Sequence, residues 1–325
     1  MRGGENMTWG GPVLMTSKLV SQLQIVIPAL CRDPVFGGIA RFLKFLDPGR
    51  DDSLKEGKPL TFGRPSRPTT DSQNGYTARM TATTTAPAFR LGIVTGLRFE
   101  AAIARRAIEA APFAGTDSAT VACHGPGQVR GSSAAAELLA AGATALLAFG
   151  VAGGCDPALP PGAVVLSTGV RDLSAGGKGE VLYTNRDWHR RLKFRLLGSM
   201  LVKEALIASA ADPVTGAAAK RALFDELNAA AVDMESAAVA RAAIEASVPF
   251  MALRAIVDGA GIGLPESALA GLGLDGGAKA AAVARTALRR PQDIPALIRL
   301  GFANNTAKKS LGRIAAATTP LFGAV

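Results

Sequence analysis

Short apolar runs alternate with Ala-rich helical segments along the middle of the chain. Runs dense in Val, Ile, Leu and Ala predict strands at residues 91–95, 119–123, 145–149, 163–168, 229–232 and 248–257. Apolar residues at helical spacing predict helices at residues 98–111, 129–141, 186–210, 216–227 and 235–246. This alternation predicts an α/β fold, a three-layer αβα domain with a mixed, mostly buried central sheet.

The pattern changes before this region. Residues 47–88 are rich in Pro, Ser, Thr, Gly and Asp, a composition typical of disordered segments. Met80 is a second candidate start, so two interpretations of the first residues are open. They are either a largely disordered extension or upstream sequence translated by mistake. We therefore separate an N-terminal extension (1–88) from a central domain (89–275).

Positive charge is concentrated at the two ends of the chain, whose formal net charge is +10. Residues 1–79 hold 11 basic and 7 acidic residues, residues 80–275 hold 17 and 18, and residues 276–325 hold 8 and 1. The near-neutral middle argues against a nucleic-acid-binding face. Residues 276–325 form a basic C-terminal extension with two predicted helices, at 279–289 and 293–316.

Cysteine and histidine usage excludes two classes of protein. Three widely spaced cysteines and two histidines indicate neither a disulfide framework nor a metal site. The longest uncharged N-terminal stretch, residues 19–31, is too short for a membrane span, which needs about 20 apolar residues. We expect a cytoplasmic protein.

Two carboxylates lie at opposite ends of one predicted helix and strand. Asp233 is a favourable N-cap, which puts Glu235 in the first turn of the helix that follows. The next apolar run brings Asp258 to the carboxyl end of its strand, where open α/β sheets bind ligands. Taken singly, Glu235 is explained by the helix dipole and Asp258 by a turn. Together they predict a ligand site.

Glycine-rich turns follow three successive predicted strands. Backbone N–H groups at such turns are available to an anion or a sugar. None of the turns matches the GxGxxG dinucleotide pattern. The glycines concerned are Gly96, Gly125, Gly127, Gly150 and Gly153.

These segments also carry a family resemblance. Three segments resemble the purine and uridine phosphorylase superfamily, which includes the methylthioadenosine/adenosylhomocysteine nucleosidases. They are FGVAGGCDPAL from Phe149, VDMES from Val232 and LRAIVD from Leu253. Two further segments, GLRFE from Gly96 and RRPQDIPALIRL from Arg289, resemble the hopanoid-associated phosphorylase branch of this superfamily. The resemblance covers about residues 91–313.

The resemblance implies a phosphorylase/hydrolase-like catalytic domain that cleaves the N-ribosidic bond of a purine nucleoside. Asp258 stands at the position of the family's general acid, which protonates the departing base. Burial keeps such a carboxyl protonated near neutral pH. Glu235 and Met234 are implied to hold the ribose. No cofactor or metal is expected, and phosphate is a candidate co-substrate.

The attacking group is left open. Glu100 stands where hydrolytic relatives place the glutamate that activates water, which favours hydrolysis. The name of the branch indicates phosphorolysis instead. The phosphate-binding arginines of the hexameric phosphorylases have no counterpart at the matching places, but Arg98 and Arg130 are candidates for a phosphate site by another route.

The hopanoid-associated branch implies a substrate whose 5′ carbon carries a large lipid, adenosylhopane, from which adenine is released. Two interpretations of the basic tail are open: peripheral contact with an anionic membrane leaflet, or an amphipathic helix packed on the domain. Alternative functions are a methylthioadenosine or adenosylhomocysteine nucleosidase and a non-catalytic nucleoside-binding protein. The superfamily also implies a homo-oligomer.

Overall fold

The protein is described by a computed structural model for residues 88–111, 113, 117–174, 176, 178–271, 273–319 and 322–324. The predictions about a disordered extension and a start at Met80 concern residues 1–87, which lie outside the described residues.

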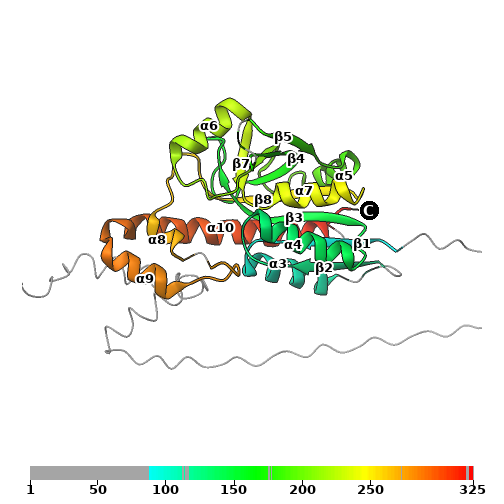
Figure 1. Ribbon diagram of the computed structural model, residues 1–325, viewed down its shortest axis with the longest axis horizontal. Coiled ribbons are helices and arrows are strands. Elements are labelled where there is room, and N and C mark those ends of the chain that lie inside the picture. Colours follow the sequence, from blue (N-terminus) through cyan, green and yellow to red (C-terminus); the bar gives the residue numbers. More distant parts are fainter. Residues whose placement is uncertain are drawn as a thin grey trace, which may run out of the picture.

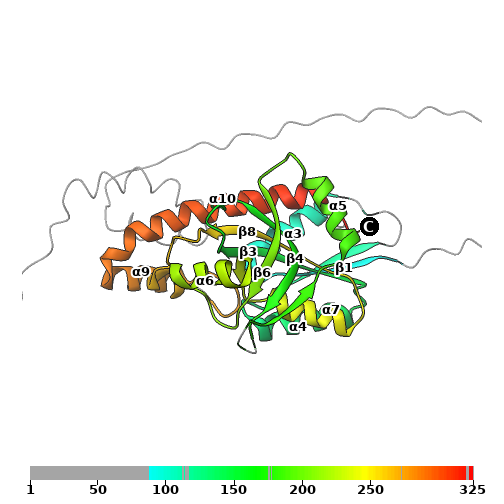
Figure 2. The same ribbon diagram turned by 90° about the horizontal axis from the view of Figure 1, so that it is seen from above.

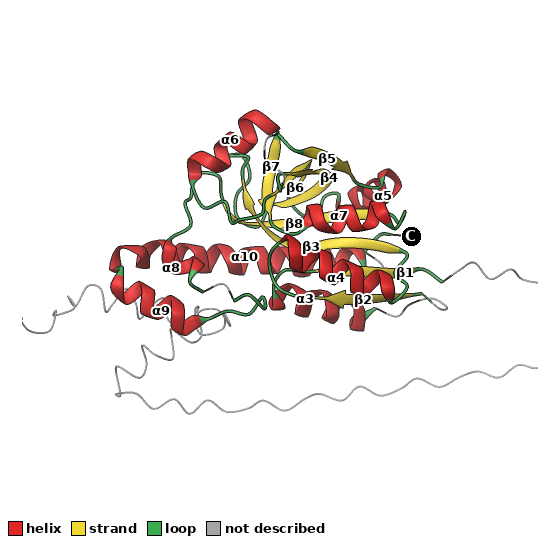
Figure 3. Ribbon diagram, in the orientation of Figure 1, coloured by secondary structure: helices red, strands yellow, loops and turns green. Residues whose placement is uncertain are grey.

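A mixed sheet forms the middle layer (Figures 1 and 3). Its strands are β1 (Arg90–Val94), β2 (Ser118–Ala122), β3 (Ala145–Gly154), β4 (Val164–Asp172), β5 (Glu180–Tyr183), β6 (Val202–Ser209), β7 (Ala229–Asp233) and β8 (Phe250–Asp258). They follow the order β2-β1-β3-β7-β6-β4-β5, and β8 pairs with both β3 and β4. Because β8 is parallel to β3 and antiparallel to β4, the predicted mixed sheet is confirmed.

Helices cover both faces of this sheet. The helices of the described residues are α3 (Arg98–Ala110), α4 (Gln128–Ala140), α5 (Arg186–Leu196), α6 (Ala217–Leu227), α7 (Ser236–Glu245), α8 (Glu266–Leu269), α9 (Ala280–Arg289) and α10 (Ile294–Thr318), with a 3-10 turn, η1, at Pro291–Asp293. One hydrophobic core packs α4 and α7 against the sheet, and another packs α3, α5 and α10 against the opposite face (Figure 2). The predicted three-layer αβα architecture is therefore confirmed.

The predicted helix over residues 186–210 is wrong in its second half. Helix α5 ends at Leu196, and Gly198 follows with a φ of 75°, a left-handed conformation that stops the helix. Residues 202–209 form β6, which pairs in parallel with β4 and β7 on its two sides. Pairing on both edges outweighs the helical spacing of this segment.

The prediction that Gly150 and Gly153 lie in turns is also wrong. Strand β3 continues to Gly154, because it pairs with β8 as far as Gly153 and with β7 at the same residue. A register shift between Ala152 and Gly153 places Gly153 opposite Asp258. The irregularity thus lies beside the carboxylate that ends β8.

The C-terminal helix is part of the packed body. Helix α10 contacts β8, α3 and α5, and its Ala307, Leu311 and Ile314 are buried in the core on that face. Its N-terminal half projects with α8 and α9 as a lobe (Figure 1). Within the described part of the chain, no helix is long and apolar enough to cross a membrane.

Candidate active site

A cavity of about 170 Å³ opens where α3 and α7 begin and β8 ends. It brings together six of the residues predicted from the sequence, which come from segments up to 162 positions apart. The six are Gly96, Glu100, Gly153, Met234, Glu235 and Asp258. Gly125, Gly127, Gly150, Arg98 and Arg130 are not among its lining residues.

Glu100 is held by backbone donors from two segments. Its Oε2 accepts hydrogen bonds from Gly96 N at 3.0 Å and Leu97 N at 2.9 Å, and its Oε1 accepts one from Val151 N at 2.7 Å. Burial raises the pKa of Glu100 to about 7, although the Arg254 charge and the Val151 N–H act in the opposite direction. A carboxylate has about four acceptor positions, so one on Oε1 remains for a ligand.

Glu235 is the N-cap of α7, one position earlier than the predicted first turn. Its Oε1 accepts a hydrogen bond from Gly127 N at 2.9 Å, and its Oε2 lies 3.5 Å from Arg254 Nη2. Burial raises the pKa of Glu235, while the Arg254 charge opposes that shift. The prediction that Asp233 is the N-cap is wrong, because Asp233 still belongs to β7 and the N-cap lies two residues later. Its Oδ1 nevertheless accepts a hydrogen bond from Ser236 N, the first N–H of the helix, at 3.2 Å.

Arg254 is a site residue that the sequence analysis did not single out. It lies in the middle of β8 with 1% of its surface exposed. Its Nε is 2.7 Å from Asp233 Oδ2, and its Nη2 donates to Ser236 Oγ at 3.0 Å. A charged residue inside an otherwise apolar strand was the available signal, because arginine is almost never fully buried unless it is paired.

Glycine at position 150 makes room for two of these groups. A Cβ there would lie 2.5 Å from Glu100 Oε1 and 2.6 Å from Arg254 Nη1. The sequence therefore needs glycine at this point of β3 because two buried polar side chains approach the backbone.

Asp258, at the end of β8, contacts a second cation that the sequence analysis missed. Lys220 of α6 is fully buried, and its Nζ forms an ion pair with Asp258 Oδ2. Burial raises the pKa of Asp258, and the Lys220 charge opposes the shift. No sequence signal distinguished Lys220 from a solvated helix residue.

Two of the N–H groups predicted to bind an anion are engaged by the protein itself. Gly96 N donates to Glu100 and Gly127 N donates to Glu235. Gly125 and Gly127 have φ values of 108° and 106°, and a Cβ on Gly125 would overlap the Leu274 carbonyl. The turns at Gly96 and Gly127 thus hold the two site glutamates.

The two candidate phosphate arginines lie apart from the smaller cavity and have other partners. Arg98 pairs with Asp275, and both side chains are exposed. Arg130 Nη1 donates to the Pro126 carbonyl at 3.3 Å. The buried cations of this region, Arg254 and Lys220, already pair with Asp233 and Asp258, so neither is free to hold a phosphate dianion.

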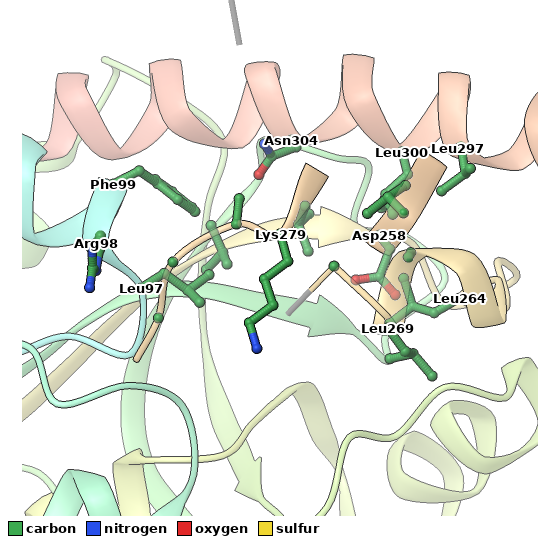
Figure 4. Close-up of a pocket in the computed structure, with 18 of the residues that line it drawn as sticks. Leu97, Arg98, Phe99, Asp258, Leu264, Leu269, Lys279, Leu297, Leu300 and Asn304 are labelled. Atoms are coloured by element: carbon green, nitrogen blue, oxygen red, sulfur yellow. The ribbon is translucent and has the colours of Figure 1, made fainter. Parts of the chain in front are cut away.

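A larger cavity of about 550 Å³ adjoins the first (Figure 4). The two share Asp258 and several apolar neighbours. Its wall is mostly apolar: Phe99 comes from the start of α3, and Leu297 and Leu300 come from α10. A hydrophobic space lined in part by the C-terminal helices therefore opens beside Asp258.

A mixed sheet lies between two layers of helices and carries a carboxylate-lined cavity at the ends of β7 and β8. This fold and site define a class, the nucleoside phosphorylases and nucleosidases, which are enzymes that act on N-ribosidic bonds. The family model of the Phosphorylase superfamily matches residues 110–294, more than half of the chain. The protein belongs to this family and is an enzyme of this class.

Solved structures agree with the fold. A putative 5′-methylthioadenosine/S-adenosylhomocysteine nucleosidase from Francisella philomiragia is 20% identical, with a TM-score of 0.54, over 73% of this chain and 99% of that one. Native futalosine hydrolase of Helicobacter pylori strain 26695 is 22% identical, with a TM-score of 0.50, over 69% and 96%. A comparison with curated proteins gives no match.

Proposed function

We propose that the enzyme releases adenine hydrolytically from an adenosine whose 5′ carbon carries a large apolar group, with adenosylhopane as the substrate. The observation that carries this proposal is the apolar cavity of about 550 Å³ that adjoins the carboxylate-lined one. A nucleoside bound between Glu235 and Asp258 would extend its 5′ substituent into that space. Concave, mostly apolar sites of this size are typical for ligands of similar bulk.

Asp258 is the general acid in this scheme. Cleavage of the N-ribosidic bond leaves negative charge on the purine, so a proton must reach the base as the bond breaks. Asp258 is 2% exposed, and its raised pKa favours the protonated form that can donate. Glu235, 3.5 Å from Arg254, accepts hydrogen bonds from the ribose hydroxyls, and Met234 packs against the sugar.

Glu100 activates water. Three N–H donors fix its carboxylate, and the remaining acceptor position on Oε1 takes the proton of a water molecule. A pKa of about 7 suits a general base at neutral pH. The pairing of Arg254 and Lys220 with buried carboxyls supports water over phosphate as the attacking group.

The direct test compares adenine release from adenosylhopane and from 5′-methylthioadenosine, with and without phosphate. We expect phosphate-independent release of free ribosyl hopanoid. Strict dependence on phosphate would refute the hydrolytic role of Glu100. Preference for 5′-methylthioadenosine would favour the second candidate, the small-substrate nucleosidase activity named for the Francisella structure.

Narrowing the large cavity tests the substrate separately. Leu300→Trp places an indole in its wall, whereas Ile244→Trp changes an α7 residue that is 55% exposed and outside the wall. We expect kcat/KM for the lipid substrate to fall at least about tenfold in the first variant only, as one or more methylene contacts are lost. If Leu300→Trp lowered kcat/KM equally for adenosylhopane and for 5′-methylthioadenosine, the assignment of the large cavity to the 5′ substituent would be contradicted.

The lobe also supports peripheral contact with an anionic membrane. Leu288 and Phe302 are exposed large apolar side chains, and Arg289 and Arg299 are exposed on the same two helices. Exposed apolar residues among basic ones suit an anionic leaflet. Because α10 contributes to the core, deleting the tail would unfold the protein, and point variants are required.

The test is flotation with phosphatidylglycerol vesicles. Replacing Leu288 and Phe302 by serine should abolish flotation. Replacing Phe194 and Leu197, which are 80% and 73% exposed near the end of α5, is the matched control. Equal flotation of both double variants would refute membrane contact by this lobe.

A further inference from the structure

Lys220 is a buried cation that the proposed chemistry does not yet use. Its side chain has no exposed surface, and its Nζ pairs with Asp258 and donates to the Ile262 carbonyl at 2.9 Å. Burying an ammonium is costly, and an apolar side chain of similar size would fill the space more favourably. A role of the Lys220 ammonium toward the Asp258 carboxyl would account for this cost.

The ion pair occupies only one side of that carboxyl. Lys220 Nζ contacts Oδ2. Asp258 lines both cavities, whereas Lys220 is not among the lining residues of either. The carboxyl is therefore open to the ligand space on a side that the ammonium does not occupy.

The surroundings of the pair contain few other groups that titrate. Strand β7 presents the apolar Val232, and the segment after β8 presents the Ile262 carbonyl. Cys155, next to β3, is the further titratable group near the pair: burial raises the pKa of its thiol to about 12, while the Lys220 charge lowers it and the Asp258 charge raises it. Among the described residues, Lys220 is therefore the charge that acts most directly on Asp258.

We propose that Lys220 is a positioning residue that sets the acid strength of Asp258 and stabilises the carboxylate formed when Asp258 gives up its proton. This inference rests on the proposed function. The carboxyl O–H bond of neutral Asp258 breaks as an N–H bond to the departing purine forms. The electron pair stays on the carboxylate, opposite the Lys220 ammonium, which keeps its own protons throughout. Solvent returns a proton to Asp258 after the purine leaves.

The experiment measures kcat/KM against pH for Lys220→Met, Lys220→Arg and the control Arg221→Met, an exposed neighbour on α6. In Lys220→Met, burial acts on Asp258 without the opposing charge. The limb of the profile that reports Asp258 should move to higher pH by at least about one unit, and the maximum should fall about 10- to 100-fold because a weaker acid donates less readily. Lys220→Arg should keep the limb near its original place, since the cation is retained.

A second measurement does not depend on turnover. In the folded enzyme with ¹³C-labelled aspartate carboxyls, the Asp258 resonance should titrate at higher pH in Lys220→Met than in the wild type. An unchanged titration in Lys220→Met, or a lower stability with an unmoved pH limb, would overturn the proposal. If no substrate releases adenine, the proposed function fails, and the carboxyl titration still decides the role of Lys220.

Discussion

The pH dependence of catalysis should be set on its acidic side by Glu100. The pKa of this buried carboxyl is raised to about 7, and only the ionised form accepts a proton from water. About half of the enzyme carries ionised Glu100 at pH 7 and about one hundredth at pH 5, so the rate should fall about 50-fold between these values. Glu100→Gln should lose about 10²- to 10⁴-fold in kcat together with this slope.

The assay follows adenine release from pH 5 to 8 in saturating substrate. Glu109→Gln is the control, because Glu109 is an exposed residue on the same helix, α3. A wild-type rate that is flat between pH 5 and 7, or a Glu100→Gln variant that keeps the slope, would refute the role of Glu100 as base.

The raised pKa of Glu100 also predicts how the stability of the fold depends on pH. The folded pKa of Glu100 lies above its unfolded value of 4.5, so the native state binds more protons between these two values. Its contribution to stability is complete below about pH 4.5 and is lost as the pH rises through 7, by about 3 kcal/mol in all. Urea unfolding should therefore show a flatter pH dependence for Glu100→Gln than for the wild type over this window.

Three further variants test particular contacts. Gly150→Ala places a Cβ within 2.6 Å of two buried side chains and should cost about 3 kcal/mol or more by thermal unfolding, whereas Gly312→Ala, with open space around it, should be neutral or stabilising. Ser267→Ala removes the hydroxyl hydrogen bond that is the main cause holding the pKa of Asp293 below its usual value, so the unfolding midpoint should drop at pH 7 and much less at pH 3. Asp258→Asn should lower kcat about 10²- to 10⁴-fold, and unchanged turnover would exclude Asp258 as the acid.

The strands and helices around the site were predictable because their burial is nearly uniform. The runs that became β1, β3 and β8 are buried on both faces, so each is a near-continuous apolar stretch in the sequence. The predicted helices that became α3 and α4 agree within one residue at each end. Local pattern and tertiary packing favour the same conformation in these segments.

Local pattern failed where pairing decided the conformation. Strand β6 has an irregular burial pattern with exposed residues near its start, so its sequence is compatible with a helix. Strand β5 is a short segment with both end residues exposed, and no apolar run marked it. Both strands form hydrogen bonds with β4. A turn separates β5 from β4 in the sequence, and β6 lies farther along the chain, so a local pattern does not reveal the pairing.

The sequence by itself determined the three-layer fold and brought forward Glu100, Met234, Glu235 and Asp258, because residue type and position after an apolar run are local properties. Only the tertiary structure decided which groups surround them. Arg254 and Lys220 acquired their importance by being buried against carboxyls from other elements. The N–H groups of Gly96 and Gly127 proved to bind these glutamates rather than an open anion site. The ionisation of each carboxyl depends on burial and on charges brought close by folding, and neither quantity exists in a linear sequence.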